Sequence, residues 1–142
     1  MKTVAQLLKL KRTGVISIRP DAQVLDALKL LAEKDIGAVL VMDGPRLVGI
    51  VSERDYARKV ALKGKTASDT PVSEIMTREV VCVTPNQTNE DCMALMTEKH
   101  ARHLPVIDNG RVIGVLSIGD LVKDAISEQQ FIIDQLEHYI HR

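Results

Sequence analysis

Hydrophobic and polar positions follow two alternating periods along the chain, and the periods change in the same order twice. Residues 15–18 form a short β-rich run, and apolar residues then recur at helical spacing over residues 24–31. Two further apolar runs, 38–42 and 47–51, are separated by a polar turn. The same order returns at residues 80–83, 92–96, 103–107 and 112–116. The pattern predicts two β-α-β-β-α units.

The two units are copies of each other. A shift of 65 positions aligns residues 15–56 with 80–121 without a gap, and twelve of the 42 aligned residues are identical. A fixed period of this kind indicates repeated structure. One unit has a three-stranded sheet with a face to cover, which is marginally stable alone. We therefore expect an α/β (α+β) protein in which two repeats, each with a three-stranded sheet, pack with pseudo-two-fold symmetry.

The repeats also set the expected boundaries. We assign residues 1–62 to repeat 1, the polar stretch 63–71 to a linker, and residues 72–142 to repeat 2. Short helical segments at 4–8 and 72–76 precede the first strands, and Asp21 and Asn86 are the expected N-caps of the helices that follow. A long helix is expected from Ser117 to the C-terminus.

The end of this long helix carries an apolar stripe. Its members are Ile132, Ile133, Leu136 and Ile140. An exposed stripe of this kind needs a cover. Either a second copy of the chain covers it in a homodimer, or it packs onto its own module.

Composition excludes several classes of function. The chain has 142 residues, its 19 Lys and Arg balance 19 Asp and Glu, and only three residues are aromatic. Neutral charge and few rings argue against a nucleic-acid binder. No apolar run approaches the roughly 20 residues of a membrane span, and the N-terminus shows no signal-peptide core. With two cysteines only, the cytoplasm is the expected compartment.

Each repeat passes from its last strand into a helix through the same motif. The two junctions read Gly49-Ile-Val-Ser52-Glu-Arg-Asp55 and Gly114-Val-Leu-Ser117-Ile-Gly-Asp120. Free N–H groups at such a helix start favour anions, and glycine lets a ligand approach the backbone. A phosphate near Ser and a ribose near Asp would describe a nucleotide. Ser-x-x-Asp is equally the pattern of a capping box, which needs no ligand.

Weaker candidates have simpler explanations. The pairs His100/His103 and His138/His141 lack the further ligands of a closed metal site, so no metal is expected. Cys82 and Cys92 fit small buried hydrophobic residues better than nucleophiles. The three methionines of this part of the chain fit core positions: Met76, Met93 and Met96.

These junctions, together with Ser73-Glu-Ile-Met-Thr77, Val80-Val-Cys-Val-Thr-Pro85 and Arg102-His-Leu-Pro-Val-Ile-Asp108, resemble a cystathionine-β-synthase (CBS) domain pair, or Bateman module. The resemblance covers nearly the whole chain and is closest to small stand-alone CBS-pair proteins. It implies clefts between the repeats that bind adenine nucleotides: AMP, ADP, ATP, sometimes NAD or S-adenosylmethionine. Asp55 and Asp120 would then hold ribose hydroxyls, and Ser52 and Ser117 would face phosphates.

The resemblance also implies where the base would lie. Thr77 and Val80 would lie beside the adenine of the second cleft, where backbone groups read the base. The remaining positions of the implied nucleotide site are Ile16, Ala38 and Pro105. Because the repeats have almost no aromatic rings, aliphatic side chains and backbone groups would hold the adenine.

The two copies differ in their cations. Repeat 1 has Arg54 beside its motif, whereas repeat 2 has Arg102 and His103 at the start of its second strand. Because phosphate needs cations or several N–H donors, we expect two different clamps, one site taking a mononucleotide and the other a longer molecule such as NAD. Three further cations fit an ordinary exposed helix face: Arg58, Lys59 and Lys63.

These observations favour a regulatory nucleotide sensor that is not an enzyme and acts in signal transduction through conformation or a homodimer. No activated nucleophile, metal cluster or acid–base pair stands beside the two aspartates. The alternatives are a structural adaptor with vestigial clefts and, less favoured, an enzyme acting on nucleotides. The sequence indicates no protein target.

Overall fold

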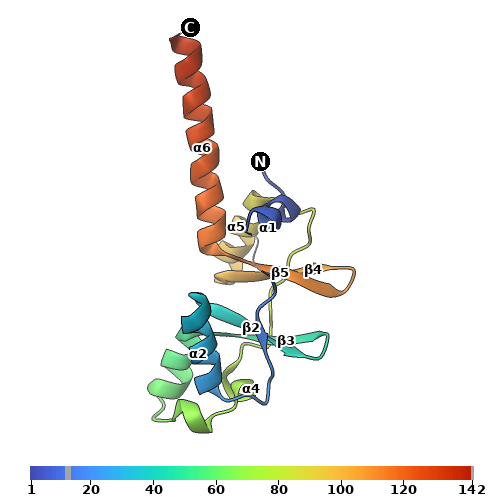
Figure 1. The fold of residues 1–142 in the computed structure, drawn as a ribbon, viewed down its shortest axis with the longest axis vertical. Helices are drawn as coiled ribbons and strands as arrows, with labels where there is room; N and C mark the ends of the chain where they lie inside the picture. Colours follow the sequence, from blue (N-terminus) through green and yellow to red (C-terminus); the bar gives the residue numbers. More distant parts are fainter. Residues whose placement is uncertain (12–13, 142) are drawn as a thin grey trace. The chain divides into compact units, whose positions relative to one another are not determined.

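The computed structural model describes residues 1–11 and 14–141 (Figure 1). Its elements in chain order are α1 (Val4–Lys11), β1 (Ser17–Ile18), α2 (Val24–Lys34), β2 (Ala38–Asp43), β3 (Arg46–Ser52), α3 (Glu53–Tyr56), the π-helical turn η1 (Ala57–Ala61), the 3-10 turn η2 (Ala67–Asp69), α4 (Val72–Ile75), α5 (Asn89–Lys99), β4 (His103–Asp108), β5 (Arg111–Ser117) and α6 (Ile118–Ile140). The mixed α/β class with a long C-terminal helix is confirmed.

Contacts divide the chain into two compact units. The repeat-1 unit contains Gly14–Val80 with Gly110–Val112, and the repeat-2 unit contains Met1–Thr13, Val81–Asn109 and Ile113–Arg142. The predicted boundaries follow the duplicated sequence, whereas the units follow packing. The difference comes from the two short helices α1 and α4, which we call the lead helices. Each lead helix packs in the unit of the other repeat.

Hydrophobic burial explains this exchange. Val4 and Leu7 of α1 join the core of the repeat-2 unit, and Val72 and Ile75 of α4 join the core of the repeat-1 unit. Backbone hydrogen bonds fix both placements: the Val4 N–H donates to the Gln87 carbonyl at 2.8 Å, and the Val72 N–H to the Ala22 carbonyl at 2.8 Å. A short amphipathic helix gains its stability from such packing rather than from its own propensity.

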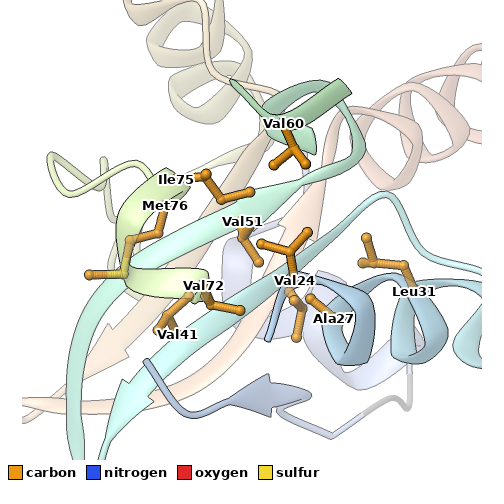
Figure 2. Packing of buried hydrophobic residues seen from close by; sticks show 10 residues of the cluster. Val24, Ala27, Leu31, Val41, Val51, Val60, Val72, Ile75 and Met76 are labelled. Atoms are coloured by element: carbon orange, nitrogen blue, oxygen red, sulfur yellow. The ribbon is translucent and has the colours of Figure 1, made fainter. Parts of the chain in front are cut away.

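The repeat-1 unit contains a three-stranded sheet in the order β1-β2-β3. β1 pairs in parallel with β2, with Ser17 opposite Leu40, and β2 pairs antiparallel with β3. The apolar face of α2 covers the sheet, as its helical spacing predicts. Figure 2 shows how side chains from α2, the strands, η1 and α4 point to a common centre; they include Val24, Ala27, Leu31, Val41, Val51, Val60, Val72 and Ile75.

Among its described residues the repeat-2 unit has two strands, β4 and β5, so the predicted strand at residues 80–83 is wrong. This segment forms a single parallel bridge, Val83 to Val106, in which the Val83 N–H donates to the Pro105 carbonyl at 2.9 Å. In repeat 1 the Leu40 N–H donates to the Ile16 carbonyl at 3.3 Å. Pro105 stands at the position equivalent to Leu40 and has no N–H, so this bond cannot form in repeat 2.

Two predicted helix starts are also wrong. α2 begins after Gln23 rather than at Asp21, and α5 begins after Thr88 rather than at Asn86. The Thr88 hydroxyl accepts from the Asp91 N–H at 3.2 Å, which makes a capping box. Asp21 instead binds Arg19. The residues that follow each proline form a turn first, so each N-cap lies two residues after its predicted position.

The two motif helices differ greatly in length. In repeat 1, α3 and η1 end at Ala61, and Gly64 then takes a left-handed φ of 69°. The equivalent position in repeat 2 is Gln129, which continues the helix, and α6 runs for 23 residues (Figure 1). Only Leu121 and Asp124 of α6 are buried. Among the described residues, no helix is long and apolar enough to cross a bilayer.

Candidate functional site

The two Ser–Asp motifs lie where the sequence places them, at the turns from β3 into α3 and from β5 into α6. Ser52 and Ser117 are the N-caps, and each hydroxyl accepts from the N–H of the motif aspartate at 3.2 Å. Each aspartate in return accepts from the backbone N–H of its serine, at 2.9 Å and 2.8 Å. The capping-box interpretation is therefore confirmed at both junctions.

The glycines of the motifs meet a lead helix. A Cβ on Gly114 would lie 2.7 Å from Leu8 Cδ2, and a Cβ on Gly49 would lie 2.7 Å from Met76 Sδ and 3.0 Å from the Thr77 carbonyl oxygen. We expected this space to admit a ligand. The lead segments, by which we mean the lead helices with the residues that directly follow them, occupy this space instead. The glycines therefore serve the packing of these segments.

Asp55 makes contacts through both carboxylate oxygens. Its Oδ2 accepts from the Ser52 N–H and hydroxyl, and its Oδ1 lies 3.1 Å from Lys59 Nζ. Lys59 also donates to the Ile75 carbonyl of α4 at 2.8 Å. Treating Lys59 as an ordinary exposed cation was wrong, since it joins the motif to a lead helix. The i,i+4 spacing from Asp55 was the available sequence signal.

Asp120 contacts a lysine from a distant part of the chain. Lys11, the last residue of α1, lies 2.9 Å from Asp120 Oδ2 and donates to the Val115 carbonyl at 2.7 Å. Burial alone would raise the pKa of Asp120, but hydrogen bonds from Ser117 and Lys11 hold this pKa below its usual range. Sequence reasoning missed Lys11, because 109 residues separate the partners and no local spacing connects them.

A charge reversal explains why the two aspartates use different partners. Lys59 of repeat 1 aligns with Asp124 of repeat 2. Asp124 is 6% exposed and binds Lys2 at 2.7 Å and the Asn89 side-chain amide at 2.7 Å. Because Asp124 is an acid, it cannot form an ion pair with Asp120. Among the described residues, the cation that pairs with Asp120 is Lys11 of α1.

The two motif aspartates consequently differ in how many further hydrogen bonds their carboxylates can accept. Asp120 Oδ2 accepts from Ser117 and Lys11, whereas its Oδ1 has no hydrogen-bond donor among the described residues. Its side chain is 27% exposed, against 12% for Asp55. Asp120 and Lys11 also line a cleft of about 280 Å³ between α1 and α6, and Lys2 and Lys123 line it too. This junction is the more open of the two.

The predicted phosphate clamps have unequal character. Arg54 and Arg102 are exposed, and in the described part of the chain neither side chain has an ion pair. His103 is half-buried at the start of β4. Burial lowers the pKa of His103, Lys11 and Arg102 lower it further, and Asp120 opposes them. These effects favour the neutral form of His103, which offers a hydrogen bond rather than a charge.

The residues expected around the base divide between the units. In the repeat-1 unit, Ala38 pairs with Ser52 across the sheet, and the Thr77 N–H donates to the Ile50 carbonyl at 2.8 Å. These contacts bring Thr77 to the first junction. Ile16 is half-buried beside the core, and Val80 is half-buried at the end of this unit. Pro105 is buried in β4 of the repeat-2 unit.

The weaker candidates differ in burial. Cys92, Met76 and Met96 are buried, but Cys82 is exposed, so its prediction as a buried residue is wrong. Partial desolvation raises the pKa of both thiols, and Asp91 adds to this at Cys92, which disfavours the reactive thiolate form. His100 ends α5 in a left-handed conformation. The described residues contain no group of three or more His, Cys, Asp or Glu that could hold a metal ion.

The comparisons with known proteins agree with this architecture. The family model of the CBS domain matches residues 5–62 and 72–126, and the chain belongs to the CBS domain family. It is 38% identical over 125 residues to the CBS domain-containing protein CBSX3, mitochondrial, of Arabidopsis thaliana. That match covers 84% of this chain and 61% of the relative, so the chain spans less than two thirds of that protein.

Solved structures give the same result. The crystal structure of the CBS domain NE2398 is 58% identical, with a TM-score of 0.85, and the match covers 88% of this chain and 98% of that one. The CBS domain protein PAE2072 from Pyrobaculum aerophilum, solved as a complex with AMP, has a TM-score of 0.75 and 24% identity, with coverage of 83% and 88%. At that identity the likeness shows the fold.

Proposed function

We propose that this protein is a regulatory module that binds an adenine nucleotide at its Ser–Asp junctions and responds by a change in conformation or assembly. The observation that carries the proposal is the Asp120 junction. There a helix N-terminus, a serine and a carboxylate that is 27% exposed, with one open oxygen among the described residues, lie together. Such a carboxylate accepts hydroxyl protons, and free N–H groups at a helix start favour phosphate. The AMP complex of the related fold supports the choice of ligand.

A thermal-shift panel with AMP, ATP, NAD and S-adenosylmethionine tests the proposal. A ligand present at a free concentration of about a hundred times its Kd should raise the Tm of the protein by about 5–10 °C. Asp120→Asn should abolish most of the rise while keeping an oxygen for the cap. Asp134→Ala is the control, because Asp134 is exposed and bonds only to Gln130 in the described chain. No shift with any ligand would favour the adaptor, and turnover of a nucleotide would favour the enzyme.

We further propose that the two junctions differ in ligand. Asp55 uses both oxygens within the protein, whereas Asp120 keeps one open, and Arg54 has a neutral glycine, Gly119, as its counterpart in repeat 2. Calorimetry with AMP and with NAD should therefore give two classes of sites with unequal affinity. Two identical and independent AMP sites would contradict this difference.

A homodimer through α6 is the proposed assembly. Its apolar stripe lies open, with Ile133 47%, Leu136 57% and Ile140 72% exposed, which supports a second copy as its cover over packing onto its own module. Residues 126, 133 and 140 are Ile, and residues 122 and 136 are Val and Leu, which gives the 3–4 spacing of a two-stranded coiled coil. A parallel second copy matches this stripe with itself and sets Gln129 against its own counterpart.

Light scattering behind size-exclusion chromatography tests the dimer. Ile133→Asp should give a monomer at micromolar concentration, whereas Phe131→Asp should not. Phe131 is 63% exposed but lies off the stripe, so it is a matched control for adding a charge to this helix. An unchanged dimer in Ile133→Asp would contradict the proposal.

The cytoplasm is the proposed compartment, because two cysteines in 142 residues do not make the disulfide framework typical of small secreted domains. The plant relative is named mitochondrial, so the comparison with that protein does not support this choice. Cell fractionation with an antibody against the chain tests it.

A further inference from the structure

Both motif aspartates are tied to a lead helix through a lysine. In the repeat-2 unit, Lys11 of α1 bridges Asp120 Oδ2 at 2.9 Å and the Val115 carbonyl at 2.7 Å. In the repeat-1 unit, Lys59 bridges Asp55 Oδ1 at 3.1 Å and the Ile75 carbonyl of α4 at 2.8 Å. The groups that the proposed nucleotide would use are therefore the groups that hold the lead helices.

The two ties differ in what they join. Lys59 lies on the same helical segment as Asp55, four residues away, so releasing it frees one carbonyl of α4. Lys11 is the last residue of α1 and reaches α6 across 109 positions of sequence. Releasing Lys11 would remove its two side-chain contacts, to Asp120 and to the Val115 carbonyl, from the C-terminal end of α1. The Asp120 tie is therefore the one with a structural consequence.

A ribose at Asp120 would compete with Lys11. Two neighbouring ribose hydroxyls donate to a carboxylate through both oxygens, and one oxygen, Oδ1, is open among the described residues. The other, Oδ2, already accepts from the Ser117 N–H and from Lys11. The Ser117 N–H is fixed by the helix cap, whereas Lys11 has a flexible side chain. The second ribose hydroxyl can therefore donate to Oδ2 only after the Lys11 ammonium has left that oxygen.

We propose that Lys11 is a ligand-released latch: ribose binding at Asp120 displaces the Lys11 ammonium and frees the C-terminal end of α1. This inference rests on the proposed nucleotide site and adds how that site is read out. α1 packs in the repeat-2 unit, yet it is joined by the chain to β1 of repeat 1. Occupancy of the Asp120 junction thus changes the C-terminal end of α1.

Adenosine is the appropriate probe, because it carries the ribose without a phosphate that any nearby lysine would attract. Lys11→Met removes the competing cation and keeps a long apolar stem. The variant should bind adenosine roughly two- to fivefold more tightly than the wild-type chain in calorimetry, since an ion pair that remains partly open to solvent is of this strength. Lys9→Met is the matched control: Lys9 lies on α1, is exposed and has no ion pair among the described residues, and its affinity should not change.

Hydrogen exchange of residues 4–11 gives an independent readout. Saturating adenosine should increase exchange at the end of α1 in the wild-type chain and in Lys9→Met. Lys11→Met should exchange fast without ligand and show no further change, whereas Lys59→Met should behave like the wild-type chain at α1.

The outcomes separate the latch from the site. Weaker adenosine binding by Lys11→Met than by Lys9→Met would make Lys11 a ligand contact and overturn the latch. Adenosine binding without a change at α1 would also overturn the latch, while leaving the nucleotide site in place. Failure of adenosine and of AMP to bind the wild-type chain would overturn the proposed function and the latch together.

Discussion

The two junctions use the same motif but differ in what their surroundings leave available. Both have a serine cap, an aspartate that completes a capping box, and a glycine under a lead segment. Around Asp55 a lysine of the same helical segment fills the remaining oxygen, whereas around Asp120 the lysine comes from α1 and one oxygen stays open in the described structure. A duplicated motif therefore specifies the local turn, and the residues around it decide what the turn can bind.

The largest expected difference between the repeats concerns the central strand. Leu40→Pro removes the N–H that pairs with the Ile16 carbonyl and places a ring inside β2. It should destabilise the repeat-1 unit by about 3 kcal/mol or more, although repeat 2 naturally carries proline at the equivalent position. Urea denaturation followed by circular dichroism measures the loss. Stability within about 0.5 kcal/mol of the wild-type chain would show that the β1–β2 pairing is not needed.

The glycines should give the next largest effect. Gly49→Ala would bring a methyl group within 3.0 Å of the Thr77 backbone oxygen, whereas Gly114→Ala would meet only the end of the Leu8 side chain. Backbone cannot yield as a side-chain terminus can, so we expect a loss of about 1–3 kcal/mol for Gly49→Ala and less for Gly114→Ala. The same denaturation series compares them. The reverse order would contradict the packing described for the lead segments.

Lowering the pH should reduce the stability of the repeat-2 unit, because two of its aspartates are stabilised in their charged forms. The pKa values of Asp120 and Asp124 lie below the usual range, because Ser117, Lys11, Lys2 and Asn89 stabilise their charged forms against the effect of burial. A lowered pKa in the folded state gives stability that is present above about pH 4 and is lost as the pH falls through the lowered value. Asp120→Asn should therefore lose less stability than the wild-type chain between pH 6 and pH 3. Thermal denaturation across this range measures it, and equal losses would contradict the assigned ion pair.

The smallest effect is expected from restoring the missing ladder bond in repeat 2. Pro105→Leu copies the residue of repeat 1 and supplies an N–H that can donate to the Val81 carbonyl. One hydrogen bond contributes about 0.5–1.5 kcal/mol, and the lost rigidity of proline offsets part of it. A newly protected amide at position 105 in hydrogen exchange would sharpen the comparison. A fast-exchanging amide there would show that another feature keeps this segment out of the sheet.

Local sequence signals predicted the helices, the hairpins and the two junctions. The spacing of Val24, Ala27 and Leu31 marked the buried face of α2, and Ser-x-x-Asp marked both capping boxes. Two N-caps were misplaced because each proline is followed by a turn before the helix. The strand expected at residues 80–83 of repeat 2 was wrong, because the apolar content of that segment does not reveal that its partner, Pro105, lacks the N–H that the pairing needs.

The sequence by itself therefore determined the helix, the hairpin and the Ser–Asp junction of each repeat, because periodicity and capping depend on neighbours a few residues apart. The tertiary structure decided which unit each lead helix joins, since the burial of Val4 or Val72 depends on which core each residue meets. It also decided that Lys11 meets Asp120 and that Lys59 meets the carbonyl of Ile75. These contacts join distant segments, and no local pattern of residues records them.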